Sequence, residues 1–140
     1  MPTPSIKQTL EFSSRAENLA KVRAFVREFL TGTILGECEA ELLVLGIDEA
    51  CSNIIRHAYN HADSQPIILC CEKLRGSLRF KLRDFGSQSD PASFQSRPLD
   101  RIEPGGLGLH LMRRAFDRVD YKLRREGTEL VLTKRLTGNS

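Results

Sequence analysis

Apolar side chains recur every three or four residues in three stretches of the chain, and this spacing predicts three amphipathic helices. The first begins at Ser14, because Ser14 and Glu17 have the spacing of a capping box, in which both side chains bond free backbone N–H groups. The second covers residues 37–59, and the third begins at the glycines of residues 105–108. The apolar positions of the first two helices are Leu19, Val22, Val26, Phe29 and Leu30, and Leu43, Ile47, Ala50, Ile54 and Ala58.

Alternation of apolar and polar side chains predicts five strands. They cover residues 5–12, 67–72, 78–84, 119–123 and 128–132. Turns at Arg75-Gly76 and Glu126-Gly127 join the second strand to the third and the fourth to the fifth as hairpins. The order of elements therefore predicts an α+β fold, a two-layer sandwich with helices on one face of an antiparallel or mixed sheet.

Composition narrows the class of protein. A chain of 140 residues has the size of one domain, so we expect a single domain over residues 1–140. Hydrophobic residues at 40% and charged residues at 28% exclude disordered and collagen-like chains. The longest unbroken apolar stretch, Ile67 to Cys71, is too short to cross a bilayer, and the polar N-terminus lacks the apolar segment of a signal peptide. We expect a cytoplasmic protein with no membrane partner.

The formal net charge of +3 is mild, and the basic residues late in the chain alternate with apolar ones. This pattern favours a solvated face over a nucleic-acid surface, because no recognisable reading element accompanies it. The four cysteines, at positions 38, 51, 70 and 71, lack metal-site or disulfide spacing and are expected to be reduced and mostly buried.

A row of polar residues borders the apolar stripe of the second helix. Glu49, Asn53 and His57 follow one another at intervals of four, so they share one side of the helix. The row is either a solvated face or a site in which a carboxylate acts as general base beside an amide oxygen that ligates Mg²⁺.

Asp84 ends the third strand in phase with its apolar row, where a charge is costly unless it is paired. It either caps the following turn or accepts a hydrogen bond from an exocyclic amine such as that of adenine. Thr128 lies in phase with the apolar row of the last strand and offers a hydroxyl.

Gly105, Gly106 and Gly108 open the third helix. Such glycines allow close approach to the free N–H groups of a helix start, which suits a phosphate, although a turn without a ligand needs them equally. They match neither a P-loop nor a dinucleotide fingerprint. The polar residues 86–103 before them are too many for a simple connection and suggest a lid.

Taken in order, four motifs resemble the N box, G1 box, G2 box and closing Gly-Thr of the Bergerat-fold ATPases. They are residues 48–59, residues 83–86, residues 105–109 and Gly127-Thr128. The likeness covers about residues 5–136 and is strongest to the anti-sigma-factor serine kinases of bacterial partner-switching systems.

The resemblance implies an ATP-binding protein with Mg²⁺, in which Glu49 is the general base and Asn53 the Mg²⁺ ligand. Asp84 would accept the adenine amine, Gly86 would let the backbone approach the base, and Thr128 would join the adenine water network. The lid, about residues 87–108, and the helix start would contact the phosphates through Gly105, Gly106, Leu107 and Gly108.

The resemblance further implies a homodimeric kinase that phosphorylates a serine on a STAS-domain antagonist and otherwise binds a sigma factor or another output protein. Gln88 and Pro104 depart from common Bergerat patterns, and they motivate an alternative, a nucleotide-sensing binding module without phosphoryl transfer. The ATP-binding half of a histidine kinase fits less well, because no additional helical pair carries a phosphoacceptor histidine.

Overall fold

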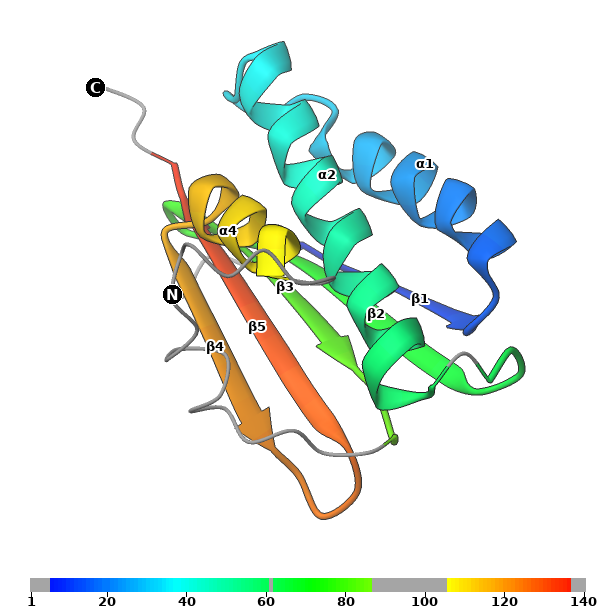
Figure 1. Ribbon diagram of the computed structural model, residues 1–140. Coiled ribbons are helices and arrows are strands. Elements are labelled where there is room, and N and C mark those ends of the chain that lie inside the picture. The colour runs from blue at the N-terminus through cyan, green and yellow to red at the C-terminus, as the bar shows by residue number, and fades with distance from the viewer. Residues whose placement is uncertain (1–5, 61, 87–105, 137–140) are drawn as a thin grey trace.

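The computed structural model describes residues 6–60, 62–86 and 106–136, and its helices cover one face of a five-stranded sheet (Figure 1). The strands are β1 (Ile6–Ser13), β2 (Pro66–Leu74), β3 (Ser77–Arg83), β4 (Arg118–Leu123) and β5 (Thr128–Arg135). They lie in the order β1-β2-β3-β5-β4, and every neighbouring pair is antiparallel. The helices are α1 (Leu19–Leu30), α2 (Glu37–Asn53) and α4 (Gly106–Ala115). The predicted two-layer α+β sandwich is confirmed, with an antiparallel sheet throughout the described strands.

The core lies between the helices and the inner face of the sheet. Alternate residues of the central strands β2, β3 and β5 are buried there, as the two-residue period of a strand requires. They are Ile67, Leu69, Cys71, Leu78, Phe80, Leu82, Leu130 and Leu132. Phe80 meets Phe29 of α1 and Phe116, which follows α4, edge to face, with ring centroids 5.7 Å apart in both pairs. One side chain of β3 thus joins both helical regions to the sheet.

The predicted capping box at Ser14 is wrong. The helix α1 begins only at Leu19, after a short 3₁₀ turn (Ala16–Asn18), and no side chain caps its start. The hydroxyl of Ser14 instead donates to the carbonyl of Ala62 and accepts the N–H of Gln65 at 3.1 Å. These bonds link the end of β1 to the start of β2. The buried Ser14 hydroxyl is therefore not available to cap the backbone N–H groups at the start of α1.

The predicted second helix is confirmed in extent but changes its winding. After α2 ends at Asn53, residues Ile54–Ala58 form one π-helical turn, in which the N–H of Tyr59 bonds the carbonyl of Ile54 at 3.0 Å. A π turn takes more residues than an α turn, so it rotates the side chains that follow.

The cysteines are free, as predicted, and burial raises the pKa of the Cys51 and Cys71 thiols, to about 12 for Cys71. Cys70 is half-buried, whereas Cys38 is exposed. Within the described residues, no helix is both long and apolar enough to span a membrane.

A buried carboxylate on the open face of the sheet gives a first testable prediction. The side chain of Glu72 is 8% exposed and accepts hydrogen bonds from Nε and Nη2 of Arg79 at 3.0 and 3.2 Å. These bonds lower the pKa of Glu72, so its ionised form stabilises the fold above the ordinary glutamate range. Glu72→Gln is expected to lower the free energy of unfolding by about 1 kcal/mol at neutral pH, because the guanidinium is partly solvated.

Urea unfolding measures this difference, with Glu11→Gln, an exposed residue of β1, as the matched control. The loss is expected to shrink as the pH falls through the lowered pKa of Glu72, where the wild type becomes protonated too. A difference between Glu72→Gln and wild type that is independent of pH would contradict the assignment.

Candidate functional site

The helix α2 and the π turn after it bring three polar side chains together. Nη2 of Arg56 donates to Oε1 of Glu49 at 3.1 Å and to Oδ1 of Asn53 at 2.6 Å. Glu49 and Asn53 are partly buried, and the Glu49 side chain is 28% exposed. The predicted pair of a carboxylate and an amide oxygen is therefore one cluster, with a guanidinium between its members.

The third predicted member of the row, His57, lies outside this cluster and is exposed. Arg56 takes the place that the four-residue spacing gave to His57, because residues three and seven apart lie on one face of a helix. Sequence analysis missed Arg56. Its signal was an interval of three from Asn53 and seven from Glu49, two spacings that share a helix face.

Asp84 is buried, at 4% exposed, where β3 ends. Its Oδ1 accepts the N–H of Gly86 at 3.0 Å. Burial raises the pKa of the Asp84 carboxyl, while the backbone N–H groups of Gly86 and Thr128 and the charge of Arg83 act in the opposite direction. A carboxylate can accept about four hydrogen bonds, so Asp84 retains capacity for an external donor.

The structure places Thr128 against Asp84. The N–H of Asp84 bonds the carbonyl of Thr128 at 3.0 Å, and the N–H of Thr128 bonds the carbonyl of Asp84 at 3.3 Å. Gly127, with a φ of +79°, makes this pairing possible, because a Cβ there would overlap the Asp84 carbonyl. Two predicted site residues from strands distant in sequence thus lie side by side.

The segment after Asp84 packs on the π turn that follows α2. The Tyr59 hydroxyl donates to the carbonyl of Pro66 at 2.6 Å and accepts the N–H of Phe85 at 2.7 Å. A Cβ on Gly86 would overlap the backbone carbonyl of Ala58. The close packing of these two segments therefore requires glycine at position 86. This structural requirement is additional to the approach to a base that the resemblance implies.

Gly86→Ala tests this packing, and we expect it to lower the free energy of unfolding by about 2–3 kcal/mol, since backbone must shift to admit the methyl group. The matched control is Gly36→Ala, where a Cβ meets nothing within 4 Å. There we expect a loss of at most about 1 kcal/mol. Equal stabilities of the two variants in urea unfolding would contradict the close approach.

Gly106, Leu107 and Gly108 lie in the first turn of α4. This helix packs beside α2 on the same face of the sheet (Figure 1). Gly46 of α2 permits the contact, because a Cβ there would lie 3.0 Å from the Phe116 ring. Gly105, Gln88, Pro104 and the rest of the predicted lid lie outside the described residues.

The donors present fit a Mg²⁺ ion that is held largely by its nucleotide. The described part of the chain contains no group of three His, Cys, Asp or Glu side chains that could hold a metal by themselves. Mg²⁺ is usually bound by one or two protein oxygens together with substrate phosphates. The amide oxygen of Asn53 is a hard oxygen donor of this kind.

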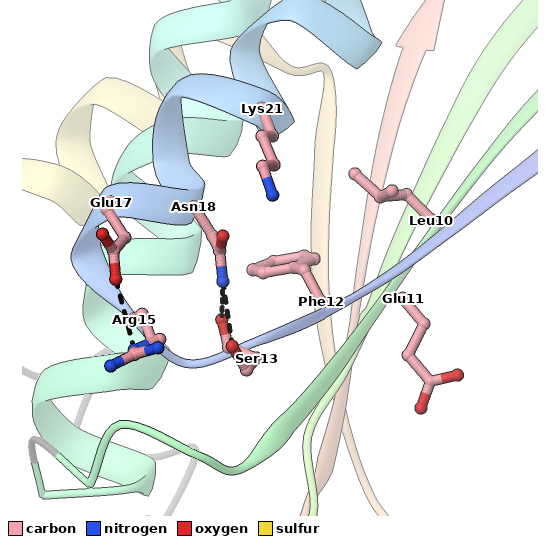
Figure 2. A pocket seen from close by; sticks show the side chains of 8 residues that line it. All are labelled: Leu10, Glu11, Phe12, Ser13, Arg15, Glu17, Asn18 and Lys21. Carbon is pink, nitrogen blue, oxygen red and sulfur yellow. Dashed lines mark hydrogen bonds and ion pairs between the residues drawn. The ribbon is translucent and has the colours of Figure 1, made fainter.

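A separate open groove of about 600 Å³ lies between β1 and the start of α1 (Figure 2). An ion pair between Arg15 and Glu17 and two hydrogen bonds from Asn18 to Ser13 border it. None of its lining residues belongs to the four motifs, so it is distinct from the candidate site.

Comparison with known proteins identifies the class that this fold and site define. The model of the histidine kinase-like ATPase domain matches residues 12–134, and the chain therefore belongs to this family. The family is one of ATPases, as the four motifs predict.

Curated relatives narrow the class to protein kinases. The chain is 35% identical over 95 residues to the serine/threonine-protein kinase BtrW of Bordetella bronchiseptica, across 65% of this chain and 67% of that protein. It is 29% identical over 108 residues to the serine-protein kinase RsbW of Bacillus subtilis, across 71% of this chain and 67% of that protein. These relatives confirm the predicted serine-kinase branch and favour a kinase over a module without phosphoryl transfer.

Solved structures confirm the fold. The RsbU and RsbW domains of Rv1364c from Mycobacterium tuberculosis match with a TM-score of 0.66 and 22% identity, over 96% of this chain and 33% of that one. The SiaB-SiaC complex from Pseudomonas aeruginosa matches with a TM-score of 0.62 and 15% identity, over 89% of this chain and 88% of that one.

Proposed function

We propose that the chain is a single-domain, ATP- and Mg²⁺-dependent serine kinase that phosphorylates a STAS-domain antagonist. In the same switch it sequesters a sigma factor or another output protein. The observation that carries the proposal is the Glu49–Asn53 cluster at the partly buried end of α2, with the Asp84–Gly86 segment packed on the end of the same helix. The names of the serine-kinase relatives support the choice of reaction.

Each residue has a defined task in this mechanism. Glu49 accepts the proton of the substrate serine as the hydroxyl oxygen bonds the γ-phosphorus of ATP. The bond from that phosphorus to the β,γ-bridging oxygen breaks, and ADP leaves. Asn53 would hold Mg²⁺ through its amide oxygen, and the bound ion would neutralise charge on the phosphates. Asp84 accepts the adenine amine, and a desolvated carboxylate is a strong acceptor there. Thr128 contributes a hydroxyl to the waters around the base, and Gly86 lets the backbone approach it.

The proposed binding site for the phosphates is the start of α4. Gly106, Leu107 and Gly108 present backbone N–H groups in the first turn of α4, where the positive end of the helix dipole favours an anion. Gly105 would contact the phosphates beside them. Residues of the lid, about 87–108, would close over the nucleotide. The likeness to the switch kinases also supports a homodimer that acts in the cytoplasm.

Nucleotide binding tests the proposal without a partner protein. With Mg²⁺-ATP at about 100 times its Kd, the free energy of unfolding is expected to rise by about 2.7 kcal/mol, on the order of 10 °C in Tm. GTP at the same concentration serves as the control, because a carbonyl at the position of the adenine amine cannot donate to Asp84. Equal stabilisation by both nucleotides, or by neither, would contradict the assigned adenine site.

A further inference from the structure

The guanidinium of Arg56 occupies the place where the proposed site needs a cation. Its Nη2 lies 2.6 Å from Oδ1 of Asn53, the proposed Mg²⁺ ligand, and 3.1 Å from Oε1 of Glu49, the proposed base. One positive group therefore bonds both oxygens. The side chain is 32% exposed, so its charged end has a path to water.

Arg56 and a metal ion cannot share Asn53 in this arrangement. Mg²⁺ binds oxygen at about 2.1 Å, so an ion on Oδ1 would lie within about 4–5 Å of the guanidinium nitrogen. Two positive charges at that distance repel strongly in a partly buried site. Either Mg²⁺ stays away from Asn53 or the guanidinium moves.

Arg56 is also incompletely satisfied where it lies. Its Nε is buried and, in the described part of the chain, has no hydrogen-bond partner. A buried donor without a partner costs free energy. If the side chain leaves this position, Nε can gain a hydrogen bond, which offsets part of the cost of the move. This is expected of a group that yields to a ligand.

We propose that Arg56 is a positioning residue that occupies the cation site of the free kinase, holds Glu49 and Asn53 together, and is displaced from Asn53 by Mg²⁺ when nucleotide binds. The inference rests on the proposed function and adds to it a competition between the Arg56 guanidinium and Mg²⁺ for the amide oxygen of Asn53. The wild type requires more Mg²⁺ to form its nucleotide complex than the same site would without the guanidinium.

The test measures two quantities for the full chain. The first is the Kd for ATP in EDTA, and the second is the Mg²⁺ concentration that gives half of the Mg²⁺-dependent rise in Tm at fixed ATP. Arg56→Met removes the donor and the charge but keeps the length of the side chain. Arg56→Lys restores the charge, and Arg23→Met is the matched control, because Arg23 bonds Asp48 at 2.8 Å with similar exposure and no contact to the cluster.

The half-saturating Mg²⁺ concentration is expected to fall roughly tenfold in Arg56→Met, as for the loss of one charge-assisted hydrogen bond. It should stay near the wild-type value in Arg56→Lys and Arg23→Met. The Kd for ATP in EDTA should change by less than about twofold in all variants. Arg56→Gln replaces the Met variant if circular dichroism shows that the latter does not fold.

Two results would overturn the inference while leaving the proposed function intact. An unchanged Mg²⁺ requirement in the Met or Gln variant would show that Arg56 does not compete with the ion. A large loss of ATP affinity in EDTA would make Arg56 a phosphate ligand instead. Absence of ATP binding in the wild type would instead overturn the proposed function.

Discussion

Glu49→Gln is expected to slow single-turnover phosphoryl transfer to the antagonist by a factor of about 10²–10⁴. The variant keeps the size of the side chain and one acceptor oxygen but cannot take the proton of the serine hydroxyl. Because Glu49 has no assigned contact with the nucleotide, the Kd for ATP should change by less than about twofold. Rapid-quench measurement of the phosphorylated antagonist gives the rate, and calorimetric titration gives the Kd.

The matched control for this change is Glu41→Gln, on an exposed turn of the same helix, where the carboxylate pairs with Arg27. Its transfer rate should equal that of the wild type. Undiminished transfer in Glu49→Gln would refute the assigned base, whereas a parallel loss of ATP affinity would mean that Glu49 acts in binding.

Asp84→Asn is expected to weaken ATP binding by about 10- to 100-fold, the range for a hydrogen bond to a charged acceptor. The amide has the same shape, but it presents a donor where the adenine amine also donates. Calorimetric titration measures the Kd, and Asp63→Asn, an exposed carboxylate, is the control. Wild-type affinity in Asp84→Asn would contradict the adenine site.

The stability of the nucleotide-free protein gives the same variant a second readout. Burial raises the pKa of Asp84, so the ionised carboxylate opposes folding at neutral pH, and the opposition fades as the pH falls through the raised pKa. Asp84→Asn removes this charge. The variant should therefore be at least as stable as the wild type at neutral pH, which separates lost binding from lost folding.

Local patterns predicted the helices and strands well, because apolar spacing records which side of each element is buried. The failures came where a partner distant in sequence decided the outcome. Ser14 has the spacing of a helix cap, yet its hydroxyl forms hydrogen bonds with the backbone of Ala62 and Gln65. The neighbourhood of β3 and β5 places Asp84 beside Thr128, a pairing that no local pattern shows.

The sequence proposed the residues of the candidate site but not their arrangement in space. The four motifs pointed to Glu49, Asn53 and Asp84 through the order in which they occur. The bridge through Arg56 follows intervals of three and seven residues, whereas the interval of four pointed to His57. The packing of Gly86 on Ala58 likewise depends on where the strand after the helix brings the chain.

The most direct test of the central claim is phosphoryl transfer itself. The wild-type chain is incubated with γ-labelled ATP, Mg²⁺ and each STAS-domain protein of the same genome, and the labelled product is exposed to acid and to alkali. A serine kinase of this family is predicted to label one of these proteins with phosphate that survives acid and is lost in alkali. Label that is lost in acid and survives alkali would identify a phosphohistidine, and no transfer to any of them would contradict the proposed reaction.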